Sequence, residues 1–252
     1  MAAIFLQRIN WFGDFKMNIP LLKVRNLSVR LDNELIIDNL SFDSGEGDVL
    51  TILGPNGAGK TVLLKTLLGL FQYEGEIVWQ KKFRMGYLPQ GLNQLSVKEL
   101  PLTIRDFFNL SDKNLSKADI ADYLNMVGLP EEILHKKASN LSGGQFKRML
   151  LSWVLIGKPQ ILFLDEPTTG LDIGGGETIY SLLKRIHDKE KLTIFLVTHD
   201  LNIVYGYSTN VLCLSKLGYS CFGKPNEILT SKTLEDMFGD HIKIFEHNHQ
   251  IK

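Results

Sequence analysis

The most informative stretch of the sequence reads Gly54-Pro55-Asn56-Gly57-Ala58-Gly59-Lys60-Thr61. It fits the spacing G-x-x-x-x-G-K-[ST] and follows a short, β-branched apolar run at residues 49–53. From Lys60 onward, apolar residues recur at helical spacing as far as Gly69. The sequence therefore predicts a buried strand, a glycine-rich loop and a helix in direct succession.

Each residue type in this loop suits the binding of a nucleoside triphosphate. Glycines let backbone N–H groups converge on phosphate oxygens without Cβ clashes, and the helix adds the positive end of its dipole. Lys60 is expected to reach the β and γ phosphates, and the Thr61 hydroxyl to ligate Mg²⁺. The predicted contacts with ATP are Gly54, Pro55, Asn56, Gly57, Ala58, Gly59, Lys60, Thr61 and Val62.

Two carboxylates follow a second buried strand, in the stretch Ile161-Leu162-Phe163-Leu164-Asp165-Glu166. In open α/β sheets, ligands bind at the carboxyl ends of the strands. Asp165 is suited to hold Mg²⁺, and Glu166 can polarise an attacking water as a general base. Together with the glycine-rich loop, this pair indicates hydrolysis of a nucleoside triphosphate.

Strand and helix patterns alternate along the rest of the chain. Further strand-length apolar stretches occupy residues 22–31, 34–43, 75–79, 84–88 and 193–198, and helical patterns occupy residues 147–156 and 176–187. Asp32-Asn33 is a turn signal, and residues 92–140 have the pattern of a small helical insertion. This order predicts an α/β fold with a mainly parallel core sheet covered on both faces.

The composition limits the classes of protein that fit. A chain of 252 residues with 44% apolar content suggests one large domain or two small ones. Lys and Arg balance Asp and Glu at 28 each, which argues against a protein whose main task is gripping nucleic acid. No apolar run approaches the ~18 residues of a membrane helix, so work at a membrane would require an integral partner. Cys213 and Cys221 are expected to be reduced and buried.

Four further segments resemble the motifs of ABC-type ATPases. Leu141-Ser142-Gly143-Gly144-Gln145 matches the family signature, and Gln90, after Gly86-Tyr87-Leu88-Pro89, resembles the Q-loop glutamine. Gly170-Leu171-Asp172 resembles the D-loop, and His199, after Phe195-Leu196-Val197-Thr198, resembles the switch histidine. All six motifs lie in the family's order, and the resemblance covers the chain from about Leu22 to Phe238.

The resemblance implies a P-loop NTPase fold of the ABC type, with an N-terminal antiparallel β subdomain beside the parallel sheet. The implied organisation is an N-terminal extension at 1–20, an ATPase domain at 21–240 and a histidine-containing tail at 241–252, with a helical subdomain inserted at about 92–155. It also implies a head-to-tail homodimer, in which each ATP lies between Gly54–Thr61 of one copy and Ser142–Gln145 of the other.

Individual roles follow from the same resemblance. The implied catalytic residues are Glu166, His199 and Gln90, and the implied Mg²⁺ ligands are Thr61, Gln90 and Asp165. The other copy's contacts to ATP would come from Ser142, Gly143, Gly144 and Gln145. Gln90 would link the nucleotide to the helical insertion, where an integral permease docks at the cytoplasmic face of the cell membrane.

One position departs from the family pattern. Many members stack an aromatic residue on adenine just after the first strand, whereas this chain has Ser28-Val29-Arg30-Leu31 there. Leu31 offers only an apolar face, so weaker selection of the base is expected. Trp153 stands where a small residue is common, and it is expected to belong to the core.

Within the family, the chain is similar to the zinc- and manganese-uptake ATPases of bacteria. The similar stretches are Gly75-Glu76-Ile77 leading to Met85–Gln90, Leu100-Pro101-Leu102-Thr103-Ile104, and Val211-Leu212-Cys213-Leu214. The resemblance implies import of a divalent metal, with zinc first and manganese or iron as alternatives. Soluble ABC ATPases of translation or DNA repair are a second class, although this chain has a single cassette and no sustained heptads. A cofactor-assembly ATPase with a soluble scaffold partner is a third class.

The two ends of the chain carry separate expectations. Residues 1–17 are expected to form a loose extension or to precede a true start at Met17, and an amphipathic anchor with Trp11, Phe12 and Phe15 is the alternative. The C-terminal tail carries His241, His247 and His249, which are expected either to be solvated or to bind zinc weakly.

Overall fold

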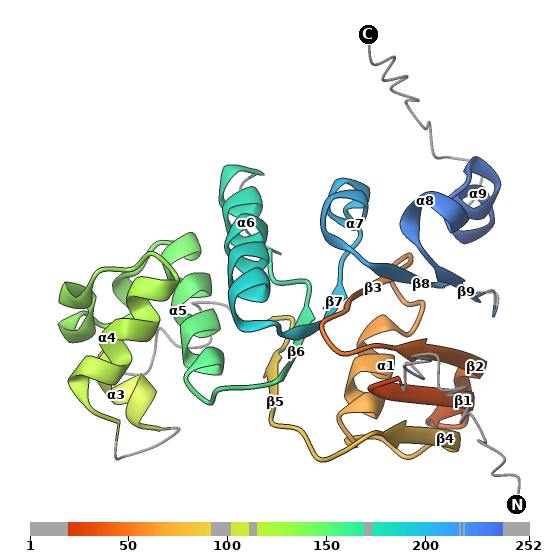
Figure 1. The fold of residues 1–252 in the computed structure, drawn as a ribbon, viewed down its shortest axis with the longest axis horizontal. Coiled ribbons are helices and arrows are strands. Elements are labelled where there is room, and N and C mark those ends of the chain that lie inside the picture. Colours follow the sequence, from red (N-terminus) through yellow and green to blue (C-terminus); the bar gives the residue numbers. More distant parts are fainter. Residues whose placement is uncertain are drawn as a thin grey trace, which may run out of the picture.

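The computed structural model describes residues 20–91, 102–110, 115–168, 173–216, 218 and 220–238, with the backbone alone at 173–178. Their strands form two sheets (Figure 1). The smaller sheet is antiparallel and has the order β2-β1-β4. Its strands are β1 (Leu22–Leu31), β2 (Glu34–Ser44) and β4 (Glu74–Trp79).

The larger sheet has the order β5-β6-β7-β3-β8-β9 and is parallel except for its last strand. Its strands are β3 (Val49–Leu53), β5 (Met85–Leu88), β6 (Ile161–Asp165), β7 (Thr193–Val197), β8 (Asn210–Leu214) and β9 (Ser220–Gly223). Every residue of β3, β6 and β7 is buried, as expected for parallel strands with both faces covered. The predicted fold class is therefore confirmed, and the strands named from the sequence end within a residue of those observed.

Some helices pack on the two faces of the larger sheet, and others gather at one end of the molecule. The helices are α1 (Lys60–Leu67), α3 (Ile104–Asn109), α4 (Lys117–Met126), α5 (Gly143–Leu155), α6 (Ile173–Glu190), α7 (Leu201–Tyr207), α8 (Pro225–Ile228) and α9 (Ser231–Phe238). One apolar core joins α3, α4, α5 and α6 to one face of the sheet, and a second lies between α1, the antiparallel sheet and the other face. In Figure 1, α3, α4 and α5 gather at the end of the molecule opposite the antiparallel sheet.

Two local signals in the sequence correspond to observed geometry. Asp32 and Asn33 have φ angles of 48° and 67°, which are the left-handed values that a tight hairpin turn requires. Thr103 caps α3 through a reciprocal pair of hydrogen bonds with Asp106, so the end of the Leu100–Ile104 segment starts a helix. Leu100 and Pro101 lie outside the described residues.

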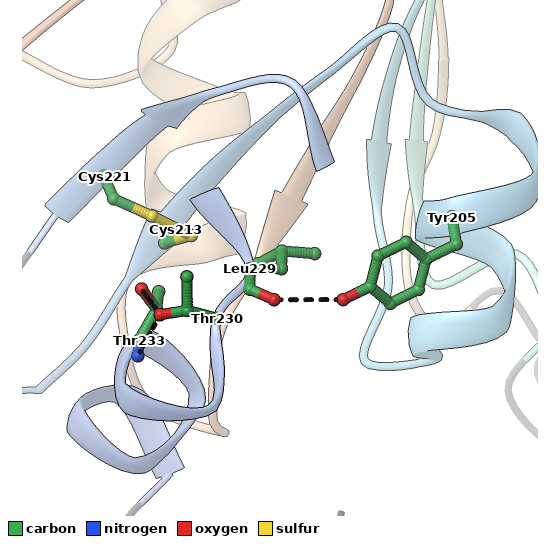
Figure 2. The surroundings of a disulfide bond; sticks show 6 residues. All are labelled: Tyr205, Cys213, Cys221, Leu229, Thr230 and Thr233. Atoms are coloured by element: carbon green, nitrogen blue, oxygen red, sulfur yellow. Dashed lines mark hydrogen bonds between the residues drawn. A yellow bond between two sulfur atoms is a disulfide. The ribbon is translucent and has the colours of Figure 1, made fainter. Parts of the chain in front are cut away.

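The expectation of two reduced cysteines is wrong in this structure. Cys213 and Cys221 are register partners on the antiparallel strands β8 and β9, with their Cα atoms 4.9 Å apart, and they form a disulfide (Figure 2). The spacing of eight residues gave no sign of this, because the pairing depends on the hairpin register. Beyond this hairpin, the Tyr205 hydroxyl of α7 donates to the Leu229 carbonyl at 3.1 Å.

Several expectations fall on residues outside the described ranges. These are the D-loop segment at 170–172, the N-terminal residues Trp11, Phe12 and Phe15, and the tail histidines His241, His247 and His249. No helix within the described part of the chain has the length and apolar character to cross a bilayer.

Candidate active site

The order of the parallel strands brings the predicted site residues to one edge of the sheet. Strands β5, β6, β7 and β3 are neighbours and point the same way, so their carboxyl ends meet. Gln90 lies just beyond β5, and Asp165 ends β6 with Glu166 next to it. His199 lies just beyond β7, and Gly54 follows β3. Ligands of open α/β sheets bind at such an edge.

The phosphate loop closes tightly between β3 and α1. Gly57 and Gly59 have φ angles of 81° and 87°, which favour glycine, and Gly59 is the N-cap of α1. A Cβ added at Gly54 would collide with the carbonyl oxygen of Leu214 on β8. The glycines are therefore required by the path of the backbone, and that path turns the first N–H groups of α1 toward the loop.

Lys60 is held inside this loop. Its side chain is buried, and Nζ donates to the carbonyl oxygens of Gly54 at 2.8 Å and Pro55 at 2.9 Å. Burial lowers the pKa of the Lys60 ammonium, while the nearby carboxylates of Glu166 and Asp165 act in the opposite direction. These contacts keep a cation at the mouth of the loop, where phosphate oxygens need one.

Thr61 and Asp165 meet across the gap between α1 and β6. The Thr61 hydroxyl donates to Asp165 Oδ2 at 2.8 Å, and Asp165 is 1% exposed. Among the described residues, Asp165 Oδ1 has no hydrogen-bond partner, and burial raises the pKa of this carboxyl group. A hydroxyl beside a buried carboxylate oxygen without a partner is a donor set that fits Mg²⁺, which prefers oxygen ligands.

Two side chains from neighbouring strand ends converge on Glu166. Gln90 Nε2 donates to Glu166 Oε2 at 2.9 Å, and His199 Nδ1 lies 3.7 Å from Glu166 Oε1. The backbone of Glu166 is left-handed, with φ of 46°, and its N–H donates to the Val197 carbonyl at 3.1 Å. Such a conformation costs roughly 1–3 kcal/mol, so the surrounding strands must fix it. The arrangement holds one carboxylate at the sheet edge between an amide and an imidazole.

The signature residues Ser142–Gln145 lie at the N-terminus of helix α5. Ser142 caps α5: its Oγ accepts from Gln145 N–H at 3.2 Å, and Gln145 Oε1 accepts from Ser142 N–H at 3.0 Å. This capping box explains why α5 begins at Gly143, earlier than the 147–156 pattern indicated. Within the described residues, no hydrogen bond or ion pair joins Ser142–Gln145 to the phosphate loop.

Two residues beside this site have no signal in the sequence. Tyr180, on α6, hydrogen-bonds to Thr198, the residue before His199. Lys216 lies beyond β8, and its Cε would be 3.1 Å from a Cβ added at Gly57. Neither residue belongs to a motif, because tertiary packing alone places them, and no pattern in one sequence could have identified them.

Comparison with known proteins agrees with this geometry. A family model described as "ABC transporter" matches residues 37–169. A zinc import ATP-binding protein ZnuC from Wigglesworthia glossinidia brevipalpis is 36% identical over 234 residues, which is 91% of this chain and 99% of the relative.

Two solved structures extend the agreement to the fold. A chain of an inward-facing ABC transporter assigned to the metal-chelate type has a TM-score of 0.76 and 28% identity, covering 87% of this chain and 89% of its own. The protein cbiO1 from Clostridium perfringens, part of the ABC transporter complex cbiONQ, has a TM-score of 0.71 and 26% identity, covering 86% of this chain and 93% of its own. The fold, the phosphate loop and these similarities together place the chain in the ABC transporter family, as an ATP-binding, ATP-hydrolysing subunit.

Proposed function

We propose that this chain powers the import of a divalent metal, zinc, through a separate integral permease. The observation that carries the metal assignment is the similarity to a zinc import ATP-binding protein along 99% of that relative. The likeness to a metal-chelate type transporter supports the same class of cargo. Manganese or iron import, and a soluble ABC ATPase of cofactor assembly, translation or repair, are the alternatives.

The site residues divide the work of ATP hydrolysis. The amides of Gly54–Thr61 and the Lys60 ammonium bind the phosphates, and Val62 continues the helix that carries them. Glu166 accepts a proton from the attacking water as general base, and Gln90 and His199 orient that carboxylate. His199 would also contact the γ phosphate in this proposal.

A Mg²⁺ ion is proposed at Thr61 and Asp165, with Gln90 completing the set. Asp165 Oδ1 supports this placement, because it has no partner in the described part of the chain and a buried carboxylate oxygen needs a hydrogen bond or a cation. Bound Mg²⁺ supplies charge neutralisation at the β and γ phosphates. The Thr61–Asp165 hydrogen bond sets the direction of both oxygen ligands before the nucleotide arrives.

A head-to-tail homodimer is proposed because, in the described part of the chain, no hydrogen bond or ion pair joins Ser142–Gln145 to the phosphate loop. Ser142 and the N–H groups of Gly143 and Gly144 lie at the start of the 13-residue helix α5, a place suited to phosphate oxygens. Gly144 has open space where a Cβ would stand, so an approaching ligand meets no obstruction there. A second copy could therefore offer these amides to the γ phosphate, so that ATP binding would close the dimer and hydrolysis would release it.

The permease is proposed to dock in a cavity of about 380 Å³ beside the start of the Q-loop segment, placing this chain peripherally at the cytoplasmic face of the membrane. The cavity lies between the end of β5 and the C-terminal part of α5. Its lining residues are Gly86, Tyr87, Leu115, Trp153, Val154, Ile156 and Gly157. Trp153 packs against Phe107 of α3, with ring centroids 5.4 Å apart, while its Nε1 has no partner among the described residues. The apolar lining suits a helix end from a permease, and both Trp153 Nε1 and the Tyr87 hydroxyl lack a hydrogen-bond partner among the described residues.

Deletion of the gene tests the cargo. Cells without this chain should grow poorly only when zinc is chelated, because the motor of their high-affinity uptake is missing. Added zinc should restore growth, and a plasmid copy of the chain should do the same. Normal growth in chelated medium, or rescue by manganese or iron but not by zinc, would contradict the zinc assignment.

Nucleotide selection should be modest, because Leu31 at the end of β1 offers no aromatic ring to stack on the base. Base–aromatic stacking contributes about 1–3 kcal/mol per base in nucleic-acid proteins, and an aliphatic side chain lacks most of it. ATP and GTP should therefore be hydrolysed with similar kcat/KM, and Leu31→Tyr should tighten ATP binding about tenfold. Strong preference of the wild-type chain for ATP would mean that another aromatic residue supplies the platform.

A further inference from the structure

Tyr180 places a hydroxyl group between the two segments that carry Glu166 and His199. Its side chain, on α6, is 3% exposed. The hydroxyl donates to Thr198 Oγ1 at 3.2 Å and lies 3.4 Å from Thr168 Oγ1. Thr198 directly precedes His199, and Thr168 comes two residues after Glu166.

The proton count fixes the direction of both bonds. A tyrosine hydroxyl has one hydrogen, and Tyr180 gives it to Thr198, so Thr168 must be the donor in the other bond. Burial raises the pKa of Tyr180, which keeps this hydrogen in place at neutral pH. Thr198 Oγ1 also accepts the backbone N–H of Asp200 at 3.1 Å. A chain of hydrogen bonds thus runs from Thr168 through Tyr180 to the backbone on the far side of His199.

These bonds bear on the site because Glu166 and His199 approach each other from different strands. Their side chains are 3.7 Å apart and reach the edge of the sheet from β6 and β7. His199 is 68% exposed at its side chain, so packing alone holds it weakly. Thr198, the residue directly before His199, is buried and therefore holds the backbone of His199 on that side.

We propose that Tyr180 is a positioning residue for ATP hydrolysis: its hydroxyl sets the spacing between the Glu166 and His199 segments. This inference rests on the proposed roles of Glu166 and His199. Among the described residues, the Tyr180 hydroxyl bonds to Thr168 and Thr198, and it acts on Glu166 and His199 through these two threonines.

Tyr180→Phe tests the hydroxyl alone, because the ring keeps its place against the core. We expect kcat to fall about three- to tenfold, as for loss of one or two buried hydrogen bonds, with KM for ATP and the melting temperature nearly unchanged. Tyr207→Phe is the matched control: its ring centroid lies 6.1 Å from that of Tyr180, but among the described residues its hydroxyl contacts only Ser181, at the exposed surface. An unchanged kcat in Tyr180→Phe, or equal losses in the two variants, would overturn the proposal.

A double-mutant cycle separates positioning from general loosening. In single-turnover assays, Tyr180→Phe should cost little more in a His199→Ala background, because the residue that it positions is already gone. If the rate of the double variant falls by the product of the two single-variant fold-losses, the proposal is wrong. If Glu166→Gln and His199→Ala both hydrolyse ATP at the wild-type rate, the proposed site itself fails. If both are slow while Tyr180→Phe is normal, the Tyr180 inference alone fails.

Discussion

Lys60→Ala should reduce ATP hydrolysis to below about 1% of the wild-type rate, since removing one fixed donor from a developing charge commonly costs a hundredfold or more. The ammonium group is buried at the mouth of the loop, where two carbonyl oxygens hold it. Without it, the β and γ phosphates would face the Asp165 and Glu166 carboxylates with one cation fewer. Nucleotide affinity should fall as well, as measured by titration with a fluorescent ATP analogue.

Two further variants test whether the positive charge of Lys60 is responsible for the loss of hydrolysis. Lys60→Met keeps a long apolar stem in the buried position and should be as inactive as Lys60→Ala. Lys117→Ala removes an exposed lysine that pairs with Glu131 at 2.8 Å, and it should hydrolyse ATP normally. Near-normal turnover in Lys60→Met with an intact fold would contradict the assignment of the phosphate loop.

Glu166→Gln should bind ATP normally but hydrolyse it at least about a hundredfold more slowly, because the amide keeps the shape of the carboxylate and cannot take a proton. The Gln oxygen can still accept the hydrogen bond from Gln90 that Glu166 Oε2 accepts. ATP should then remain bound between two copies. Size-exclusion chromatography with ATP should show a dimer for this variant and a monomer without nucleotide.

Glu227→Gln provides the control for this substitution. Glu227 is an exposed carboxylate 3.5 Å from Lys224, far along the chain from the site, and its loss should change neither kcat nor assembly. Rapid phosphate release by Glu166→Gln would exclude Glu166 as the base. Slow hydrolysis without an ATP-dependent dimer would leave the base in place and contradict the head-to-tail arrangement.

The local parts of the fold could be predicted because their signals are local. The β3–loop–α1 unit follows from one glycine pattern between an apolar run and a helical one, and the Asp32-Asn33 hairpin follows from two residues that tolerate left-handed backbone. The limits of α5 and α6 were less accurate. Their ends depend on capping and on contacts with the core, and the pattern of apolar residues records neither.

The convergence on Glu166 could be predicted only from the family resemblance. Gln90 and Glu166 are separated by 76 residues in the sequence, and their contact exists because β5 and β6 are neighbours in the sheet. The order of strands is a property of the whole chain, so neither residue carries a local sign of it. Tyr180 and the Cys213–Cys221 pairing were overlooked for the same reason.

The most direct test of the account is uptake of radiolabelled zinc by cells that lack this chain and carry it back as wild type or as Glu166→Gln. We expect the wild-type copy to restore zinc uptake and the Glu166→Gln copy to leave it at the level of the deletion, with manganese and iron uptake equal in all strains. This result would show that Glu166, the carboxylate that Gln90 and His199 contact, is required for the transport of zinc. Zinc uptake that is unchanged by deletion, or restored equally by both copies, would contradict it.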